Sequence, residues 1–256
     1  MSSLLEQEKI MDAQNRYSRQ LKLLGEEGQQ KLKNATVLIA GIGGLGGTTA
    51  IYLAAAGIGK LIIAHEGKIV PPDLNRQILM DSQKIGEDRI PCAIESLKRI
   101  NPEVVVEAYP ERISYQASYP WVEKSDIVVD ARYDFPERYE LNHLCVDIGK
   151  PMVEAAMSGF EISLTTVKPG ETACLACIFP DREKSWEPLG FPVLGATSGI
   201  AGCLAAIEVI KALTGIGEPY YNKLYRFDSL HFTSSTFALK RNPSCSHCSD
   251  KRGVEK

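Results

Sequence analysis

The amino-acid sequence predicts an α/β protein built on a Rossmann-like mixed sheet, mostly parallel, with helices on both faces and antiparallel strands near the C-terminus. Three observations support this fold class. Short apolar runs alternate with helical patterns through the first 157 residues. Each run has a continuous apolar stretch, as expected for parallel strands buried on both faces of a sheet. A glycine-rich turn joins the first run to the first helical pattern, a common strand-to-helix connection in such folds.

Five apolar runs are expected to form the parallel part of the sheet. The first run ends at a cluster of glycines, and the helical pattern after it stops at Gly57. Pro91 lies in the first turns of a later helical segment, where its missing N–H costs no hydrogen bond. The predicted strands cover residues 36–40, 60–65, 103–109, 126–131 and 151–157, and the later predicted helices cover residues 87–100 and 137–149.

The two ends of the chain differ from this alternating middle. Residues 1–31 are rich in Glu, Gln, Lys and Leu and are predicted to be helical, with breaks at Gly25 and Gly28. Residues 161–170 alternate between apolar and polar side chains, which predicts an antiparallel strand. Residues 223–241 predict two more strands with a turn between them. No linker separates these parts, so we expect a single domain.

The composition excludes several classes of protein. The chain has 256 residues, a formal net charge of −3 and an estimated pI of 5.9, which gives no reason to expect a nucleic-acid partner. Residues 1–20 are polar and lack the apolar core of a secretion signal. Residues 199–217 are apolar, but Glu208 and Lys211 interrupt them, so we expect a buried helix and no membrane partner. These features predict a cytoplasmic protein.

The main motif of the first half is the glycine-rich turn, with glycines at Gly41, Gly43, Gly44 and Gly46. It follows a predicted strand and opens a predicted helix, the context that a dinucleotide-type phosphate loop requires. Gly41 would permit the tight turn, Gly43 the close approach of a phosphate, and Gly46 the packing of helix on strand. The helix N-terminus would then present N–H groups to an anion. The alternative interpretation is a glycine-rich turn that binds nothing.

The end of the second predicted strand departs from the nucleotide-binding pattern. That pattern places an acid there to bind the ribose hydroxyls, but this chain has His65, followed by Glu66. A neutral histidine can still bond to a hydroxyl, although more weakly than a carboxylate does. Because successive strand residues point to opposite faces, Glu66 could replace the acid only if the strand has already ended.

Two C-x-x-C pairs indicate a metal site in the second half. Cys174 and Cys177 form the first pair, and Cys245 and Cys248 form the second. Two such pairs supply four thiolates, which complete a closed, structural zinc site. A redox pair is the alternative, but the second pair lies in a loop-like tail, whereas redox pairs usually begin a helix. His247 lies between two of the cysteines and is expected to be a bystander.

In this order, the motifs resemble the MoeB/ThiF/HesA adenylyltransferases, relatives of the ubiquitin-activating enzymes. The resemblance depends on Arg16-Tyr-Ser-Arg19-Gln, the glycine loop, Asp73-Leu-Asn-Arg76-Gln and the cysteine pairs. It implies a small ubiquitin-like or sulfur-carrier partner ending in Gly-Gly, whose C-terminal carboxylate attacks the α-phosphate of ATP. It also implies Mg²⁺ and a two-fold dimer. Some members carry a catalytic cysteine in a crossover loop, but the matching residues 182–195 contain none.

The resemblance also implies roles for particular positions. Arg76 would clamp the phosphates, and Arg19 would reach across the dimer into the neighbour's ATP site. A surface salt bridge is the alternative for either arginine. The single domain, residues 1–256, would divide into a nucleotide-binding half at 35–157 and a carrier-binding half at 158–256.

Three positions depart from the family pattern at the ATP site. His65 replaces the acid. Arg89 stands where the family has a lysine, and its planar, forked guanidinium is not equivalent at a tight phosphate site. Tyr133 stands where the family has the aspartate that helps to hold Mg²⁺, and a phenol is a poor ligand for that ion. Asp130 and Asp134 flank this tyrosine, and either could substitute.

These departures leave three hypotheses. The favoured one is a partner subunit with a degraded ATP site, which donates Arg19 to an active relative and helps to dock the carrier. The second is an active adenylyltransferase in which Arg89 and either Asp130 or Asp134 replace the usual groups. The third is a nicotinamide-dependent oxidoreductase with Glu66 on the ribose, which leaves the cysteine pairs unexplained.

Overall fold

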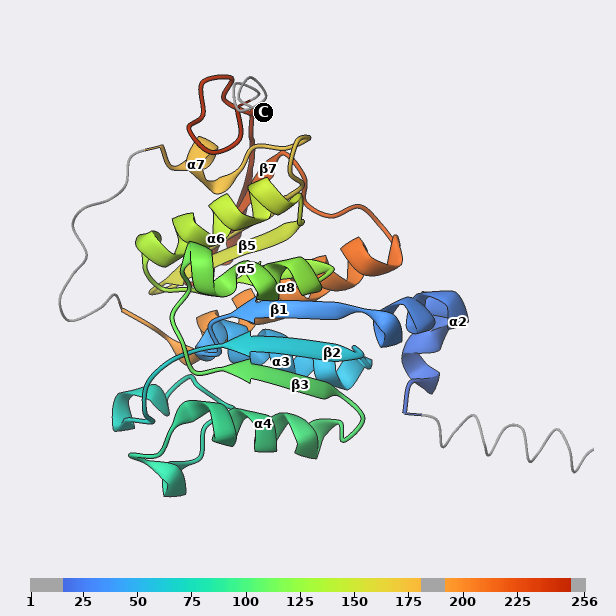
Figure 1. Cartoon of the computed structure of the whole chain (residues 1–256), viewed down its shortest axis with the longest axis vertical. Helices are drawn as coiled ribbons and strands as arrows, with labels where there is room; N and C mark the ends of the chain where they lie inside the picture. The colour runs from blue at the N-terminus through green and yellow to red at the C-terminus, as the bar shows by residue number, and fades with distance from the viewer. Residues whose placement is uncertain (1–15, 181–191, 250–256) are drawn as a thin grey trace, which may run out of the picture.

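A computed structural model describes residues 16–180 and 192–249 of the chain. It contains one eight-stranded sheet with the order β3-β2-β1-β4-β5-β6-β7-β8 (Figure 1). β1 to β5 pair in parallel, and β6, β7 and β8 are antiparallel, which confirms the predicted mixed sheet. The strands are β1 Thr36–Ala40, β2 Lys60–Ala64, β3 Val105–Tyr109, β4 Ile127–Asp130, β5 Met152–Ser158, β6 Glu161–Val167, β7 Lys223–Asp228 and β8 Thr233–Ala238.

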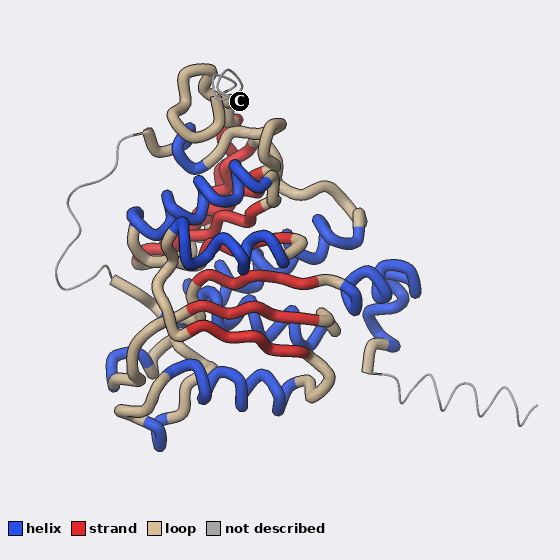
Figure 2. Tube along the Cα trace, in the orientation of Figure 1, coloured by secondary structure: helices blue, strands red, loops and turns tan. Residues whose placement is uncertain are grey.

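Helices cover both faces of the parallel part (Figure 2). Alternate side chains of β1 show the two layers, because Val37 and Ile39 pack with α3, α4 and α8, whereas Leu38 and Ala40 pack with α5, α6 and α7. Both sets are fully buried, which explains why the strand is apolar from Val37 to Ala40. The helices are α2 Ser18–Asn34, α3 Gly44–Ala56, α4 Arg89–Ile100, α5 Tyr115–Lys124, α6 Phe135–Ile148, α7 Leu175–Ile178 and α8 Gly195–Thr214, with short 3₁₀ turns at Pro71–Asp73 and Ser82–Lys84.

The strand order reverses between β1 and β4. From β1 the chain moves outward to β2 and β3 on one side, and it then returns to place β4 and β5 on the other. In doubly wound sheets, ligands bind at the carboxyl ends of the strands at such a reversal. The turn that follows β1 is the glycine-rich motif, so the fold places that motif at the expected ligand position.

Two details of the sequence analysis need correction. Gly25 interrupts α2 with a left-handed backbone angle of 66°, but Gly28 does not break the helix. Gly28 is buried inside α2, where a Cβ would lie 3.5 Å from Ile216 and 3.8 Å from Thr214. Its small size therefore serves helix packing and not a turn. Helix α5 was not predicted, because Pro120 lies within it.

Among the described residues, only α8 has the length and composition of a membrane span. It packs along α3 and against β5 and β6 within the fold. Glu208 on this helix is buried and accepts a hydrogen bond from Thr166 at 2.6 Å. These contacts are those of a core helix with one polar edge, as the sequence predicted.

Candidate functional site

The glycine loop connects β1 to α3. Gly41 has a φ of +100°, and a Cβ there would lie 2.6 Å from the carbonyl oxygen of Ala131. A Cβ on Gly46 would lie 1.8 Å from the carbonyl oxygen of Gly41, so only glycine allows this approach of helix to strand. A Cβ on Gly43, by contrast, would meet nothing closer than Gln77 at 4.0 Å. The loop is therefore closed by packing at its ends and open at its middle, where the first N–H groups of α3 could bind an anion.

Gly44 lies where two other segments approach the loop closely. A Cβ there would lie 2.4 Å from the hydroxyl of Ser198 and 3.1 Å from Cγ of Arg76. The absent side chain thus admits α8 on one side and the Arg76 side chain on the other. Arg76 donates to the carbonyl oxygen of Pro72 at 2.7 Å and lies beside the loop, where the sequence analysis expected a phosphate clamp.

Arg89 begins α4 and lies close to this loop. Its Nη2 donates to Oδ2 of Asp73 at 2.5 Å, and its Nη1 lies 2.7 Å from Nε2 of His65. Asp73 is buried and also accepts from the side-chain amide of Gln77 at 2.8 Å. The Arg76 guanidinium is 3.7 Å from the same carboxylate. Asp73 therefore holds two arginines next to the glycine loop.

His65 follows directly after the end of β2 and is buried. Its Nδ1 lies 3.3 Å from the backbone nitrogen of Ile42 in the loop. Burial, together with the charges of Arg132 and Arg89, lowers the pKa of His65 to about 3. The ring is consequently neutral at pH 7, and the position that holds an acid in the nucleotide-binding pattern carries no negative charge here.

Arg132 is the site residue that the sequence analysis did not identify. It follows β4 by two residues and is almost fully buried. Its Nη2 donates to Oε1 of Glu137 at 2.6 Å, and its Nη1 lies 3.3 Å from Nδ1 of His65. A signal was present, because an arginine just beyond the carboxyl end of a strand at the sheet reversal lies where ligands bind.

The two aspartates that flank Tyr133 are both engaged by arginines. Asp130 is fully buried, and its Oδ2 accepts from Nε of Arg138 at 2.9 Å. Asp134 caps α6 by accepting from the backbone nitrogen of Glu137 at 3.0 Å, and its other oxygen accepts from Arg112 at 2.8 Å. Tyr133 itself is exposed at the surface.

Glu66 lies beyond the end of β2, so the condition for it to replace the missing acid is met. Its side chain is half-exposed and lies 3.6 Å from Arg112. Because Mg²⁺ in proteins takes mainly oxygen ligands, with carboxylates foremost, the acids around the loop are the candidate ligands. Within residues 16–180 and 192–249, every one of these carboxylates contacts an arginine: Glu66, Asp73, Asp130, Asp134 and Glu137. This donor set does not fit Mg²⁺.

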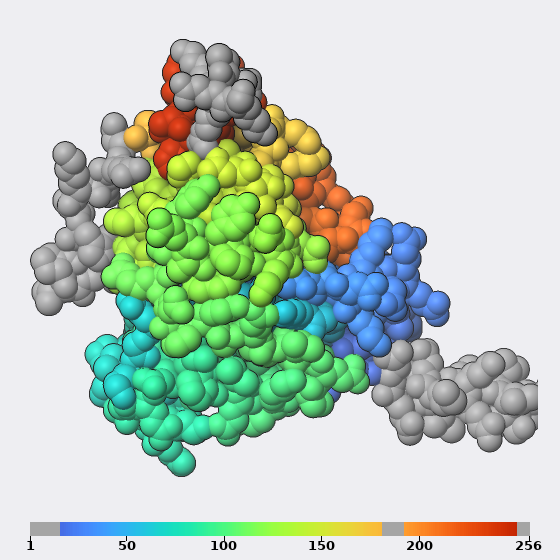
Figure 3. Space-filling view, viewed as in Figure 1, coloured from blue at the N-terminus to red at the C-terminus, as the bar shows by residue number. Residues whose placement is uncertain are grey.

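Arg19 lies far from the glycine loop. It is exposed on α2, which precedes β1, whereas the loop follows β1 (Figure 1). The five residues of β1 separate them by about 17 Å at ~3.3 Å per residue. Neighbours in the motif hold this segment in place: Arg16 donates to the carbonyl oxygen of Ile100 at 2.8 Å, and Gln20 donates to that of Ala56 at 2.7 Å. Helix α2 projects from the side of the body (Figure 3). Arg19 therefore cannot contact a ligand bound at the glycine loop of its own chain.

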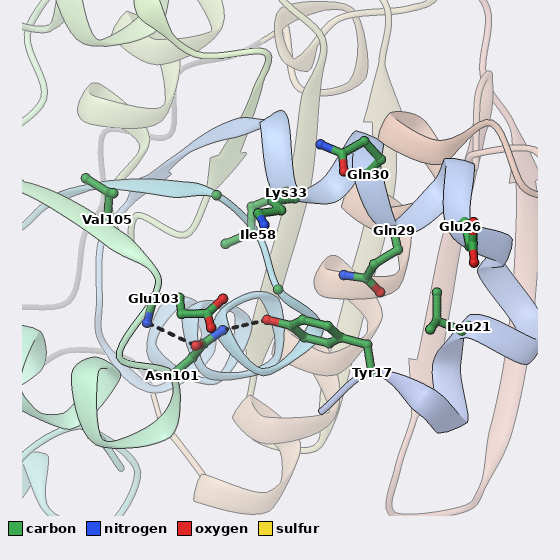
Figure 4. Close-up of a pocket in the computed structure, with 12 residues that line it drawn as sticks. Tyr17, Leu21, Glu26, Gln29, Gln30, Lys33, Ile58, Asn101, Glu103 and Val105 are labelled. Carbon is green, nitrogen blue, oxygen red and sulfur yellow. Dashed lines mark hydrogen bonds between the residues drawn. The ribbon is translucent and has the colours of Figure 1, made fainter. Parts of the chain in front are cut away.

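A groove of about 550 Å³ lies at the amino ends of the strands, beside α2 (Figure 4). There the side-chain amide of Asn101 donates to the hydroxyl of Tyr17 at 3.0 Å. The residues that line this groove include none of the glycine loop, which lies at the opposite ends of the strands. We therefore place the candidate site by its chemistry and its position in the fold, and not by the size of this groove.

The four predicted metal ligands come together between α7 and the C-terminal segment (Figure 1). The sulfur atoms of Cys174, Cys177, Cys245 and Cys248 all lie within 4.8 Å of one another. A tetrahedral zinc with Zn–S bonds of about 2.3 Å separates its sulfurs by ~3.8 Å. The separations here include 3.9 Å for Cys174–Cys177, 3.7 Å for Cys174–Cys245 and 3.3 Å for Cys177–Cys248. The side chain of His247 points elsewhere, with Nδ1 3.0 Å from the side-chain amide of Asn142. The cluster fits a four-thiolate metal site.

Comparison with known proteins identifies the family. The model of the ThiF family matches residues 17–247, nearly the whole chain. The chain belongs to the ThiF family. The predicted resemblance is therefore confirmed, and the match includes the glycine loop and three of the four clustered cysteines, Cys174, Cys177 and Cys245.

Named relatives give this ThiF-family chain a context. It is 44% identical over 235 residues to Protein HesA, heterocyst, of Trichormus variabilis, covering 91% of this chain and 88% of that protein. It is 35% identical over 250 residues to the sulfur carrier protein adenylyltransferase of Thermus thermophilus, covering 93% of this chain and 91% of that protein. Among solved structures, MccB of E. coli with ATP superposes with a TM-score of 0.80 at 27% identity, covering 91% of this chain and 73% of that one.

Proposed function

We propose that this chain is a ThiF-family partner subunit that acts with a small carrier protein but does not adenylate it at its own glycine loop. The observation that carries the proposal is the pairing of carboxylates with arginines around that loop. Asp130 is bound to Arg138, and Asp134 is bound to Arg112 and to the N-terminus of α6. Without a carboxylate free to hold Mg²⁺, the loop lacks the ion that a triphosphate normally brings to phosphoryl chemistry.

The relatives support a carrier protein or peptide as the partner. The Thermus thermophilus relative is named for adenylating a sulfur carrier protein, and MccB of E. coli has been solved with MccA-N7isoASN. We therefore propose a small ubiquitin-like or sulfur-carrier protein ending in Gly-Gly, which binds to the half formed by residues 158–256. Structural zinc on the four cysteines would hold the end of that half in place. A cytoplasmic location is part of this proposal.

The placement of Arg19 supports action across an interface. Arg19 is exposed on α2 and forms no ion pair within the described residues, while its motif neighbours Arg16 and Gln20 anchor the helix. An arginine held outward on a fixed helix can enter the phosphate site of a second subunit, as a dimer with an active relative requires. In a homodimer, Arg19 would instead enter the glycine-loop site of a second copy of this chain.

The experiment is ATP–pyrophosphate exchange by an active ThiF-family relative with its carrier protein, with and without this chain. We expect background exchange from the chain alone, and faster exchange from the mixture than from the relative alone. Arg19→Ala should remove the gain, whereas Lys22→Ala, which deletes a positive charge one turn along the same exposed face, should keep it. No gain in exchange, with no association by light scattering, would reject the proposal.

A second candidate is an active adenylyltransferase. One observation favours it: Arg76 lies against Gly44 of an intact glycine loop, where it could clamp a phosphate. The same assay separates the two candidates, because exchange by the chain alone, dependent on a carrier protein, would establish the second.

A further inference from the structure

Two arginines, the buried Arg132 and the partly buried Arg89, converge on His65 next to the glycine loop. Arg89 comes from the start of α4, and Arg132 comes from the segment after β4. Their guanidinium nitrogens lie 2.7 Å from Nε2 and 3.3 Å from Nδ1 of the ring, respectively. The backbone N–H of Ile42 also points at Nδ1, at 3.3 Å. Hydrogen-bond donors therefore face both nitrogens of one imidazole.

A neutral imidazole cannot satisfy this arrangement. It carries one N–H and one lone pair, so it accepts at only one of its two nitrogens. If the proton is on Nδ1, it faces the donors of Arg132 and Ile42; if it is on Nε2, it faces Arg89. Protonation makes the conflict worse, because both ring nitrogens then become donors. Whichever tautomer is present, the cluster has at least one hydrogen-bond acceptor too few.

Other atoms of the cluster also lack partners. Nε of Arg89 and Nε of Arg132 are buried without a hydrogen-bond partner among the described residues. The Arg132 side chain is 2% exposed and the Arg89 side chain is 16% exposed. Buried donors without acceptors are costly and uncommon. The atoms that would complete this cluster are hydrogen-bond acceptors, such as the oxygens of a phosphate.

We propose that the glycine loop binds the phosphates of a nucleoside triphosphate free of Mg²⁺, with the guanidinium groups of Arg132 and Arg89 next to the loop in the role of the metal charge. A phosphate oxygen there accepts the hydrogen bonds that His65 cannot. Guanidinium groups bind phosphate oxygens directly and in pairs, whereas Mg²⁺ would occupy those oxygens and repel the arginines. The inference rests on the proposed function in one respect, that this site does not carry out the metal-dependent reaction.

Calorimetric titration of the full chain with ATP tests the inference directly. One titration contains EDTA and the other contains MgCl₂ in excess over ATP. We expect ATP to bind at least tenfold more tightly in EDTA. Equal or tighter binding with Mg²⁺, or no binding in EDTA, overturns the inference. This comparison uses the unmodified protein, so it does not depend on the folding of any variant.

A pair of variants assigns the effect to the cluster. Arg132→Met removes the buried charge and keeps a side chain of similar length, and we expect at least a tenfold loss of affinity for ATP in EDTA. Arg226→Met removes an arginine from the exposed ion pair with Glu161 on β6 and should bind as the unmodified chain does. Melting temperatures show whether each variant is folded. If a folded Arg132→Met variant keeps its affinity, Arg132 has no part in binding.

The two proposals fail separately. A chain that stimulates an active relative but binds ATP only with Mg²⁺ contradicts this inference and leaves the partner-subunit role standing. A chain that binds metal-free ATP but never stimulates a relative supports the inference and removes that role.

Discussion

The buried carboxyl group of Glu154 on β5 gives a quantitative test of the network beneath the loop. Its side chain is fully buried and pairs with Arg138, which also holds Asp130. Burial raises the pKa of Glu154 from 4.5 to about 6, although the charge of Arg138 opposes the shift. Because the folded-state pKa lies above the unfolded value, the stability from this group is complete below pH 4.5 and is lost as the pH rises through 6.

The expected loss follows from the size of the shift. A difference of about 1.5 pKa units at ~1.36 kcal/mol per unit is about 2 kcal/mol. Glu154→Gln stays neutral at every pH, so the free energy of unfolding of the original chain should fall by about 2 kcal/mol relative to this variant between about pH 4 and pH 7.5. Urea unfolding across that range measures the difference.

A matched substitution controls for other groups that titrate. Glu161→Gln alters an exposed glutamate that pairs with Arg226 between neighbouring strands. The difference in the free energy of unfolding between the original chain and this variant should change by less than about 0.5 kcal/mol over the same pH range. The account of a buried, proton-binding Glu154 is wrong if the stability of the original chain relative to Glu154→Gln changes as little with pH as in this control. It is also wrong if that relative stability rises with pH.

Three further substitutions test the loop, the cysteine cluster and the arginines. Gly46→Ala puts a Cβ 1.8 Å from a loop carbonyl oxygen and should abolish ATP binding in EDTA by calorimetry and lower stability by at least about 1 kcal/mol, whereas Gly199→Ala, with nothing within 4 Å, should do neither. Cys177→Ser should reduce zinc from one ion per chain towards none by elemental mass spectrometry, and Cys203→Ser should not. Arg89→Lys gives up the two-point contact with the histidine ring and the neighbouring carboxylate, and it should weaken metal-free ATP binding in calorimetry about tenfold, or about 1.4 kcal/mol. Unchanged affinity for Gly46→Ala or Arg89→Lys, or full zinc content in Cys177→Ser, would contradict the corresponding assignment.

Local patterns predicted most of the fold. The parallel strands were visible because each contains a short apolar run, as burial on both faces of a sheet favours. The four cysteines were correctly predicted to lie together, although 71 residues separate Cys174 from Cys245. The prediction was possible because C-x-x-C spacing already implies two ligands from one turn. Helix α5 was missed because Pro120 suggests a break, although Ser114 caps the helix and accepts from the backbone nitrogen of Ala117.

The candidate site was less predictable, since its chemistry depends on contacts between distant segments. Nothing around Arg132 in the sequence indicates that it meets His65, which lies 67 residues earlier. The availability of Asp130 as a ligand is likewise decided by Arg138, a residue on α6 that local patterns do not link to a strand end. Sequence patterns located the glycine loop, but only the fold showed which charges surround it.

The arginine cluster distinguishes a binding site from a turn whose shape is explained by packing alone. Packing alone accounts for Gly44 and Gly46, so their presence does not show that a nucleotide binds. No such packing need explains Arg132. Its partner Glu137 also accepts hydrogen bonds from Arg112 at 3.1 Å and from the backbone nitrogen of Ile113 at 2.8 Å, so Glu137 stays paired when Arg132 is replaced. Replacing a buried charge whose partner remains satisfied need not destabilise a fold. A folded Arg132→Met variant that loses only its affinity for ATP would therefore show that this cluster binds a ligand and does not hold the fold together.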